Sequence, residues 1–220
     1  MGHMGTMGGT ANHHTVNGTR APNGIEISCA YLPQPLNGAT RARLRAQLPY
    51  GRRLRASASP RMQSQSLLAV ALACELLTRV TQRPLRPAQL RYTALGKPYA
   101  PGFPEFSISH SGGWVVCALA AVGRIGIDVE AVLAGSRRAA LAAWTAKEAT
   151  LKAAGARLQD LPQVQLCGRR LHFQDRRWYC RAPMLSVDTV LRVVSSVPIT
   201  TLRLRRIPAG RVVAWQEALG

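Results

Sequence analysis

The chain has 220 residues, of which 47% are hydrophobic and 18% charged, values typical of a globular protein rather than a disordered one. Its 29 basic and 10 acidic residues give a formal net charge of +19, which predicts an anionic partner: nucleic acid, a phosphate-bearing small molecule, an acidic protein or a membrane surface. Apolar runs such as Leu67–Cys74 are far shorter than the roughly 20 residues that a bilayer requires, so no membrane span is expected.

The residues before the first predicted element, 1–23, are rich in Gly, His and Thr, begin like an expression tag and are expected to be disordered. The five cysteines are dispersed and form no CxxC pair. This usage predicts reduced thiols in a cytoplasmic protein, most of them small core residues.

The apolar periodicity from Ile25 onward predicts a mixed chain of helices and strands. In chain order we expect a strand over 25–31, helices over 40–47 and 61–79, a Gly- and Pro-rich loop over 96–104, strands over 106–110, 114–121 and 124–130, a helix over 141–154, and strands over 164–166, 170–173, 177–181, 189–195, 200–206 and, last and short, 212–215. The order of strand, helix and strands occurs twice. It indicates an α+β fold of two similar halves, 24–123 and 124–220, joined near Gly123.

The segment RIGIDVE, residues 124–130, alternates apolar and other side chains, as a strand does. Asp128 and Glu130 fall on the same face, roughly 6.5–7 Å apart, and could converge on one small cation. The alternative is a half-exposed strand with a solvated acidic face.

The predicted helix WTAKEATLKAAG, residues 144–155, places Trp144, Glu148 and Lys152 on one face. Glu148 and Lys152 could form an ordinary surface ion pair. Glu148 could instead be a third oxygen ligand beside Asp128 and Glu130, a set that suits Mg²⁺. Cys and His residues offer no comparable zinc site.

The segment FSISHSGG, residues 106–113, supplies three alternating serines and His110. A Ser/His hydrolase is disfavoured, because no G-x-S-x-G turn is present and the serines directly flank the histidine. These groups, with Lys97, are better suited to binding phosphate. Lys97, Lys147 and Lys152 are the chain's only lysines, which indicates sites where a compact ammonium is preferred to the planar guanidinium of arginine.

Four motifs, GKP at 96–98, FSISHSG at 106–112, GIDVE at 126–130 and WTAKEATLK at 144–152, resemble in order the signature motifs of 4′-phosphopantetheinyl transferases, most closely those of the surfactin-synthetase type. The resemblance implies an α+β fold of two similar halves in a pseudo-twofold arrangement, with coenzyme A contacts in 24–123 and the metal and catalytic residues in 124–220. It also implies a cytoplasmic, monomeric, magnesium-dependent enzyme of nonribosomal peptide or polyketide biosynthesis. Such an enzyme transfers the phosphopantetheine arm of coenzyme A to a serine of an acyl or peptidyl carrier protein and releases 3′,5′-ADP.

By the same resemblance, Asp128, Glu130 and Glu148 would hold Mg²⁺, for which Mn²⁺ could substitute. Glu148 would also be the general base, and Lys152 would stabilise the transition state at the pyrophosphate. Coenzyme A would be bound by residues of the first half; these are Arg52, Arg53, Ser66, Lys97, Ser109 and His110. A basic enzyme would attract both coenzyme A and an acidic carrier protein, and neither nucleic acid nor membrane is an expected partner.

One departure from the family pattern is the separation of Asp128 and Glu148, which is 20 positions and about half of that in large members of the family. The shortened segment raises the alternative of a coenzyme A-binding relative with impaired catalysis. A basic nucleic-acid-binding protein is the other alternative, but aromatic residues make up only 5% of the chain and the arginines are dispersed.

Overall fold

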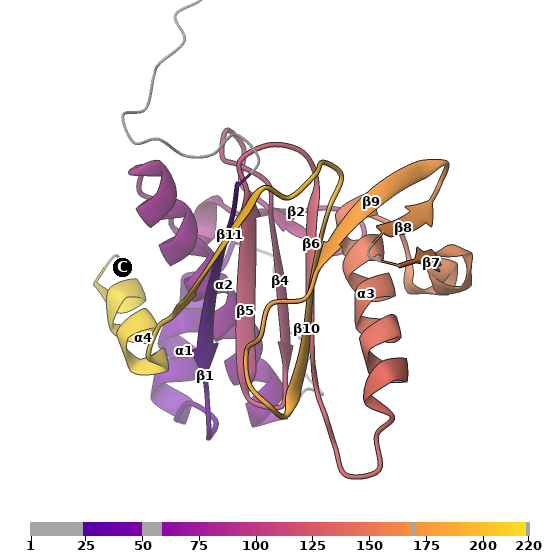
Figure 1. The fold of residues 1–220 in the computed structure, drawn as a ribbon. Helices are drawn as coiled ribbons and strands as arrows, with labels where there is room; N and C mark the ends of the chain where they lie inside the picture. Colours follow the sequence, from indigo (N-terminus) through magenta and orange to yellow (C-terminus); the bar gives the residue numbers. More distant parts are fainter. Residues whose placement is uncertain (1–23, 50–58, 169, 219–220) are drawn as a thin grey trace, which may run out of the picture.

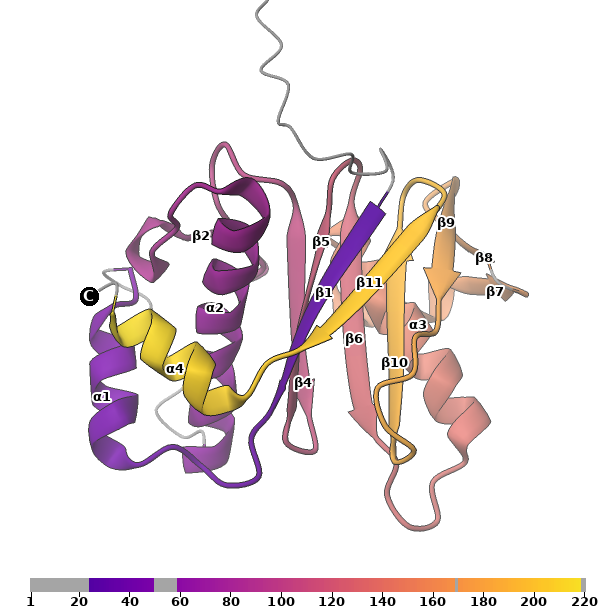
Figure 2. The ribbon, with the colours of Figure 1, turned by 60° about the vertical axis from the view of Figure 1, so that its left-hand side comes forward.

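Two β-sheets form the middle of the molecule, and helices cover their outer faces (Figures 1 and 2). The computed structural model describes residues 24–49, 59–168 and 170–218, so the tail 1–23 lies outside the described residues. The observed architecture is mixed α and β, as the sequence predicts.

The first sheet has the strand order β11-β1-β5-β4. Its strands are β1 (Gly24–Tyr31), β4 (Phe106–Ser111), β5 (Trp114–Ala120) and β11 (Thr201–Arg206). β1 is parallel to β11 and antiparallel to β5, with Ile27 opposite Leu204 and Ala118. The last strand of the chain therefore lies beside the first, although the sequence assigns it to the second half.

Three helices cover the outer face of the first sheet, and Figure 2 shows them together on one side of the molecule. They are α1 (Gly38–Ala46), α2 (Pro60–Thr81) and α4 (Ala209–Glu217). α2 begins after Ser59, whose hydroxyl accepts a hydrogen bond from the Met62 amide, and has proline at its first position, both common helix-start features. Its buried apolar side chains form most of the core on this side.

The prediction of a short strand over 212–215 is wrong, because these residues belong to helix α4. The sequence VVAW favours a strand by composition. In the structure, Val212 and Gln216 are both buried at the helical spacing of four residues, since α4 packs against α2. Tertiary packing thus outweighs local propensity here.

The second sheet has the order β6-β10-β9-β8-β7 and is covered on its outer face by the helix α3 (Arg138–Ala154). Its strands are β6 (Ile125–Ala131), β7 (Gln165–Cys167), β8 (Arg170–Phe173), β9 (Arg176–Arg181) and β10 (Thr189–Ser195). α3 begins one turn earlier than the sequence predicts and ends at Gly155, which has a positive φ of 69°.

Short elements complete the fold. The strand β3 (Pro98–Tyr99) lies within the region expected to be a loop and pairs with β2 (Arg91–Tyr92), which precedes that region. Two 3₁₀ turns are η1 (Pro87–Gln89) and η2 (Leu158–Gln163). None of the helices in the described ranges combines the length and apolarity that crossing a membrane demands.

The inner faces of the two sheets pack against each other through a buried cluster that includes Ile27, Ala118, Ile127 and Val193. The edge strand β4 of the first sheet lies against the edge strand β6 of the second. This seam between the sheets positions the residues described below.

The five cysteines all lie in the described ranges and are free thiols, as predicted. Cys29, Cys74 and Cys117 are buried, and burial raises the pKa of the Cys74 thiol to about 12. These three therefore act as small core residues.

Candidate active site

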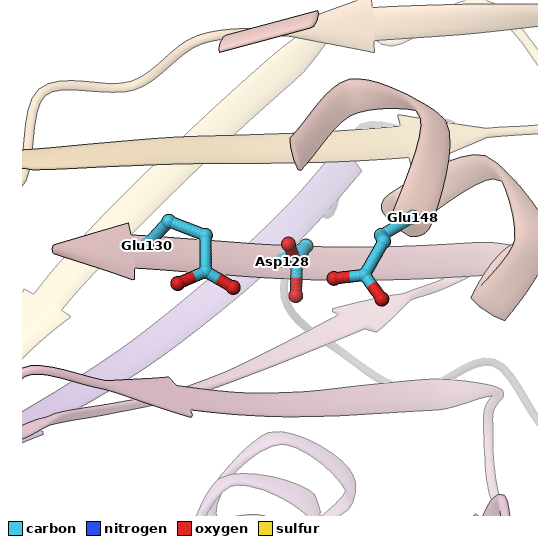
Figure 3. A group of neighbouring side chains, drawn as sticks. All are labelled: Asp128, Glu130 and Glu148. Atoms are coloured by element: carbon cyan, nitrogen blue, oxygen red, sulfur yellow. The ribbon is translucent and has the colours of Figure 1, made fainter. Parts of the chain in front are cut away.

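Three carboxylates meet between the strand β6 and the helix α3 (Figure 3). Asp128 and Glu130 extend from β6, and Glu148 extends from α3 towards them; one oxygen of each lies within 4.8 Å of the other two. Because Ile125, Ile127 and Val129 point into the core between the sheets, the intervening acids must face α3. The predicted convergence of these three side chains is confirmed.

Gly126 allows α3 to approach β6 closely enough for this convergence. A Cβ atom at Gly126 would lie 1.9 Å from the carbonyl oxygen of Ala149 and 2.6 Å from the amide nitrogen of Ala153. Both atoms belong to the backbone of α3, which cannot rotate away as a side chain could. The missing side chain therefore determines the distance between the two elements that carry the carboxylates.

Asp128 is 1% exposed, so the alternative of a solvated acidic face is wrong for this residue. Its Oδ1 accepts hydrogen bonds from Ser109 Oγ at 2.8 Å and from Lys152 Nζ at 2.6 Å. Its Oδ2 is buried and has no hydrogen-bond partner among the described residues. An unsatisfied buried carboxylate oxygen is unfavourable unless a cation or donor approaches it.

The carboxylates therefore fit a divalent cation by their chemistry. All three offer oxygen atoms, which Mg²⁺ and Mn²⁺ prefer, and the half-buried Glu130 and Glu148 leave one side of the group open. Asp128 Oδ2 is a buried carboxylate oxygen to which no group in the described part of the chain donates a hydrogen bond. The group could hold a metal ion together with a ligand in the adjoining pocket.

The surroundings of Glu130 and Glu148 raise the pKa of both carboxyls. Burial, followed by the neighbouring charge of Asp128, raises the pKa of the Glu148 carboxyl above its ordinary value. Burial also raises the pKa of Glu130, although the hydrogen bond from Ser111 opposes this effect. A carboxyl with a raised pKa is a better proton acceptor near neutral pH than an ordinary one.

Lys152 reaches across from α3 to the strand side of the site. Its ammonium donates to Asp128 Oδ1 and, at 3.1 Å, to Ser109 Oγ. The alternative of a simple surface pair with Glu148 is therefore not the contact that the structure has. Lys152 neutralises one oxygen of Asp128 and keeps a side chain that is 34% exposed towards the pocket.

Ser66 of α2 and His110 of β4 lie together in the lining of the same pocket. Ser66 Oγ is 3.4 Å from His110 Nε2, within hydrogen-bond distance. Burial, followed by the positive charge of Lys152, lowers the pKa of His110. The imidazole is thus held in its neutral form near pH 7 and can still donate one hydrogen bond to a ligand.

Lys97 is engaged by the protein rather than free. Its Nζ donates to Glu105 Oε1 at 2.5 Å and to the carbonyl oxygen of Ile125 at 3.0 Å. Burial lowers the pKa of Lys97, although the interaction with Glu105 opposes this effect. The lysine connects the loop before β4 to the start of β6, a role that the sequence does not indicate.

One pocket of about 760 Å³ joins these groups, which is large enough for a nucleotide-sized ligand. Every predicted site residue within the described ranges lines it; these are Ser66, Lys97, Ser109, His110, Asp128, Glu130, Glu148 and Lys152. Arg124 adds a further cation to the wall. Arg52 and Arg53 lie outside the described residues.

Two contacts of the site were not predicted from the sequence. Ser111 donates to Glu130 Oε2 at 2.8 Å, and Glu105 is the partner of Lys97. The alternation of Ser111 with Ser109 on β4 was a usable signal for the first. Glu105 has no local signal, since its role depends on a contact with a residue eight positions away across a loop.

Comparison with known proteins gives one short similarity. No family model matches the chain. A curated protein of Bacillus subtilis described as a 4′-phosphopantetheinyl transferase is 51% identical over 43 residues, and the match spans only 19% of this chain and 19% of that protein. Over that segment, the similarity supports the phosphopantetheinyl transferase family that the four motifs resemble.

Proposed function

We propose that this chain transfers the 4′-phosphopantetheine arm of coenzyme A to a serine of an acyl or peptidyl carrier protein. The serine oxygen attacks the pantetheine-linked phosphorus of the pyrophosphate and forms a phosphodiester. The bond from that phosphorus to the bridging oxygen breaks, 3′,5′-ADP leaves with the bond's electron pair, and the serine proton passes to a base on the enzyme.

The observation that carries this proposal is the position of the three carboxylates. Asp128, Glu130 and Glu148 converge within 4.8 Å at one side of a 760 Å³ pocket whose other walls carry hydroxyl, imidazole and ammonium groups. Both kinds of group suit a diphosphate: a metal ion held by the carboxylates would neutralise its charge, and the hydroxyl, imidazole and ammonium groups would donate hydrogen bonds to its oxygens. The short match to a phosphopantetheinyl transferase agrees with this chemistry.

Asp128, Glu130 and Glu148 would hold Mg²⁺ or Mn²⁺, which when bound would neutralise negative charge on the phosphates. Glu148 is the group suited to take the proton from the carrier serine, because its carboxyl is only partly buried and lines the pocket that the serine would enter. Lys152 is suited to donate to the pyrophosphate oxygens, because its partly exposed ammonium already lies at the pocket wall.

The remaining residues bind and orient coenzyme A in this proposal. Ser109, His110 and Ser66 contact its phosphates, with His110 and Ser66 as the donors because the Ser109 hydroxyl already donates to Asp128. Lys97 lies near the 3′-phosphate. Because Lys97 pairs with Glu105, the positive charge that Lys97 presents to the pocket is partly neutralised. Arg52 and Arg53 are proposed as additional contacts on the basis of the motif resemblance alone.

We place the protein in the surfactin-synthetase type, with two similar halves in a pseudo-twofold arrangement, and propose that it acts as a cytoplasmic monomer without nucleic-acid or membrane partners. The connection from β6 to α3, residues 132–137, is short. It still allows the three carboxylates to meet, which supports retained chemistry. Its effect is expected on recognition of the carrier protein, for which relatives use a longer segment here.

The test is labelling of a panel of acyl and peptidyl carrier proteins with a fluorescent coenzyme A, with and without Mg²⁺. The wild-type protein should label at least one carrier only when Mg²⁺ is present. Glu148→Gln should abolish labelling while its thermal unfolding remains cooperative. The matched control is Glu217→Gln, since Glu217 lies on α4 outside the pocket and pairs with Arg43 on the surface.

Each other outcome points to a different protein. Coenzyme A binding without labelling of any carrier identifies a relative that has lost catalysis. Absence of coenzyme A binding, together with tight duplex binding that weakens steeply with salt, identifies a nucleic-acid-binding protein instead. Full activity in Glu148→Gln would remove Glu148 from both its proposed roles.

A further inference from the structure

The serines of β4 connect the two sheets at their seam. Ser107, Ser109 and Ser111 occupy alternate positions, so their hydroxyls all lie on the face directed at β6. β4 pairs with β5, and β6 pairs with β10, in two separate sheets. Side-chain hydroxyls on β4 thus bond to the edge of the neighbouring sheet.

The three hydroxyls do not have the same partners. Ser107 accepts a hydrogen bond from the backbone amide of Ile127 at 3.2 Å and, among the described residues, is hydrogen-bonded to no carboxylate. Ser111 accepts from the amide of Ala131 at 3.2 Å and also donates to Glu130 Oε2 at 2.8 Å. The Ser107 hydroxyl therefore only connects the two sheets, whereas the Ser111 hydroxyl connects them and also binds the Glu130 carboxylate.

Ser111 restrains a side chain that the backbone alone leaves mobile. Glu130 lies one residue from the end of β6, is partly exposed and has one more rotatable bond than Asp128. Asp128, by contrast, is buried and is held by both Ser109 and Lys152. For Glu130, the donor that the structure provides is the Ser111 hydroxyl.

The turn after Ser111 maintains this contact. Gly112 has a φ of +60°, and a Cβ atom there would lie 2.5 Å from the Cβ of Ala131. The glycine lets the end of β4 approach the end of β6, and this approach places Ser111 within reach of both Ala131 and Glu130. The backbone and the hydroxyl therefore act together on one carboxylate.

We propose that Ser111 is a positioning residue that orients Glu130 towards a divalent cation shared with Asp128 and Glu148. The inference rests on the proposed function, because it assumes that these carboxylates hold a metal ion. Ser111 fixes one oxygen of Glu130 and so restricts where the other can lie. Outer hydrogen-bond partners of metal ligands typically account for about 10–100-fold in metal affinity.

The experiment measures Mn²⁺ and Mg²⁺ dissociation constants by calorimetry on the full chain, without coenzyme A or carrier protein. Ser111→Val and Ser111→Thr have nearly the same shape and differ in the hydroxyl, so packing effects cancel between them. The valine variant should bind either ion about tenfold more weakly than wild type. The threonine variant should restore binding to within about threefold, because it keeps the donor.

Ser107→Ala is the matched control for a purely structural effect. It removes a hydroxyl from the same strand and leaves the buried Ile127 amide unpaired, which should lower the thermal unfolding midpoint. Its metal affinity should equal that of wild type. If the ions bind Ser107→Ala as weakly as Ser111→Val, affinity follows general loosening of the seam and the inference is overturned.

Equal affinity in Ser111→Val and Ser111→Thr would also overturn it, while leaving the proposed function intact if wild type binds the ions. A wild-type protein that binds neither ion would overturn the inference together with the metal-dependent mechanism. Thermal unfolding of every variant is recorded alongside. The Val and Thr comparison therefore remains informative even if both variants are less stable than wild type.

Discussion

Gly126→Ala tests whether close packing of α3 on β6 assembles the carboxylates. The new Cβ would begin 1.9 Å from the Ala149 carbonyl oxygen, whereas ordinary contact starts at 3.4 Å. The helix backbone must therefore move away from the strand by about 1.5 Å, since a methyl group on a strand cannot rotate aside. Overpacking of this kind should lower the free energy of unfolding by about 1–3 kcal/mol.

The same movement separates Glu148, on the helix, from Asp128, on the strand. A misplacement of about 1 Å at a reacting group can lower a rate by about 100-fold. We therefore expect at least that loss in carrier labelling, together with weaker Mn²⁺ binding, because one metal ligand moves relative to another. Denaturant unfolding, calorimetry and the fluorescent labelling assay measure the three effects.

Gly210→Ala is the matched control, because Gly210 lies in α4 and a Cβ atom there has no neighbour within 4 Å. It should be neutral or stabilise the protein by up to about 1 kcal/mol, as expected for alanine within a helix. If Gly126→Ala matches this control in stability and metal affinity, α3 does not pack on β6 as described. The reasoning about how the site is assembled would then be refuted.

Three further predictions concern charged groups of the site. Without divalent cations, the raised pKa values of Glu148 and Glu130 mean that the folded state binds protons more tightly than the unfolded chain, so the contribution of these residues to stability falls as pH rises above their ordinary pKa of 4.5. Between about pH 5 and about pH 7, the melting temperature of Glu148→Gln should therefore decrease less than that of wild type. Lys152→Met removes the ammonium from buried Asp128 and should lower the free energy of unfolding by about 1–3 kcal/mol, a loss that added Mg²⁺ should partly reverse. Denaturant titrations measure both effects, and an unchanged unfolding midpoint would contradict the contact. Lys97→Met should destabilise the protein by about 1–2 kcal/mol even without any ligand, because the ammonium connects a loop to β6. A loss of coenzyme A affinity with unchanged stability would instead assign Lys97 to ligand binding alone.

Most helices and strands were predictable because their apolar periodicity reflects burial on one face. The strand 124–130 is an example: alternation correctly separates Ile125, Ile127 and Val129 from the two acids. The helix around Glu148 is predictable by the same logic at its own period. Residues 212–215 were misassigned because Val-Val-Ala-Trp favours a strand locally, and only packing against α2 makes the segment helical.

The location of the candidate site was also largely predictable. All predicted site residues in the described ranges line one pocket, as expected of motifs that are proposed to share a ligand. Their hydrogen-bond partners were not predictable. Lys152 bonds to Asp128, 24 positions away, rather than to Glu148 on its own helix, and Lys97 pairs with Glu105.

The sequence by itself determined which residue types share a face and which chemistry they can perform, because both follow from local spacing. Tertiary structure alone decided how close the two sheets lie and where the last strand returns. It also decided that Asp128 is buried with one oxygen that has no hydrogen-bond partner among the described residues, and that Ser111 donates to Glu130. These features arise where β4, β6 and α3 meet, and contacts between elements distant in the chain depend on packing that local periodicity does not encode.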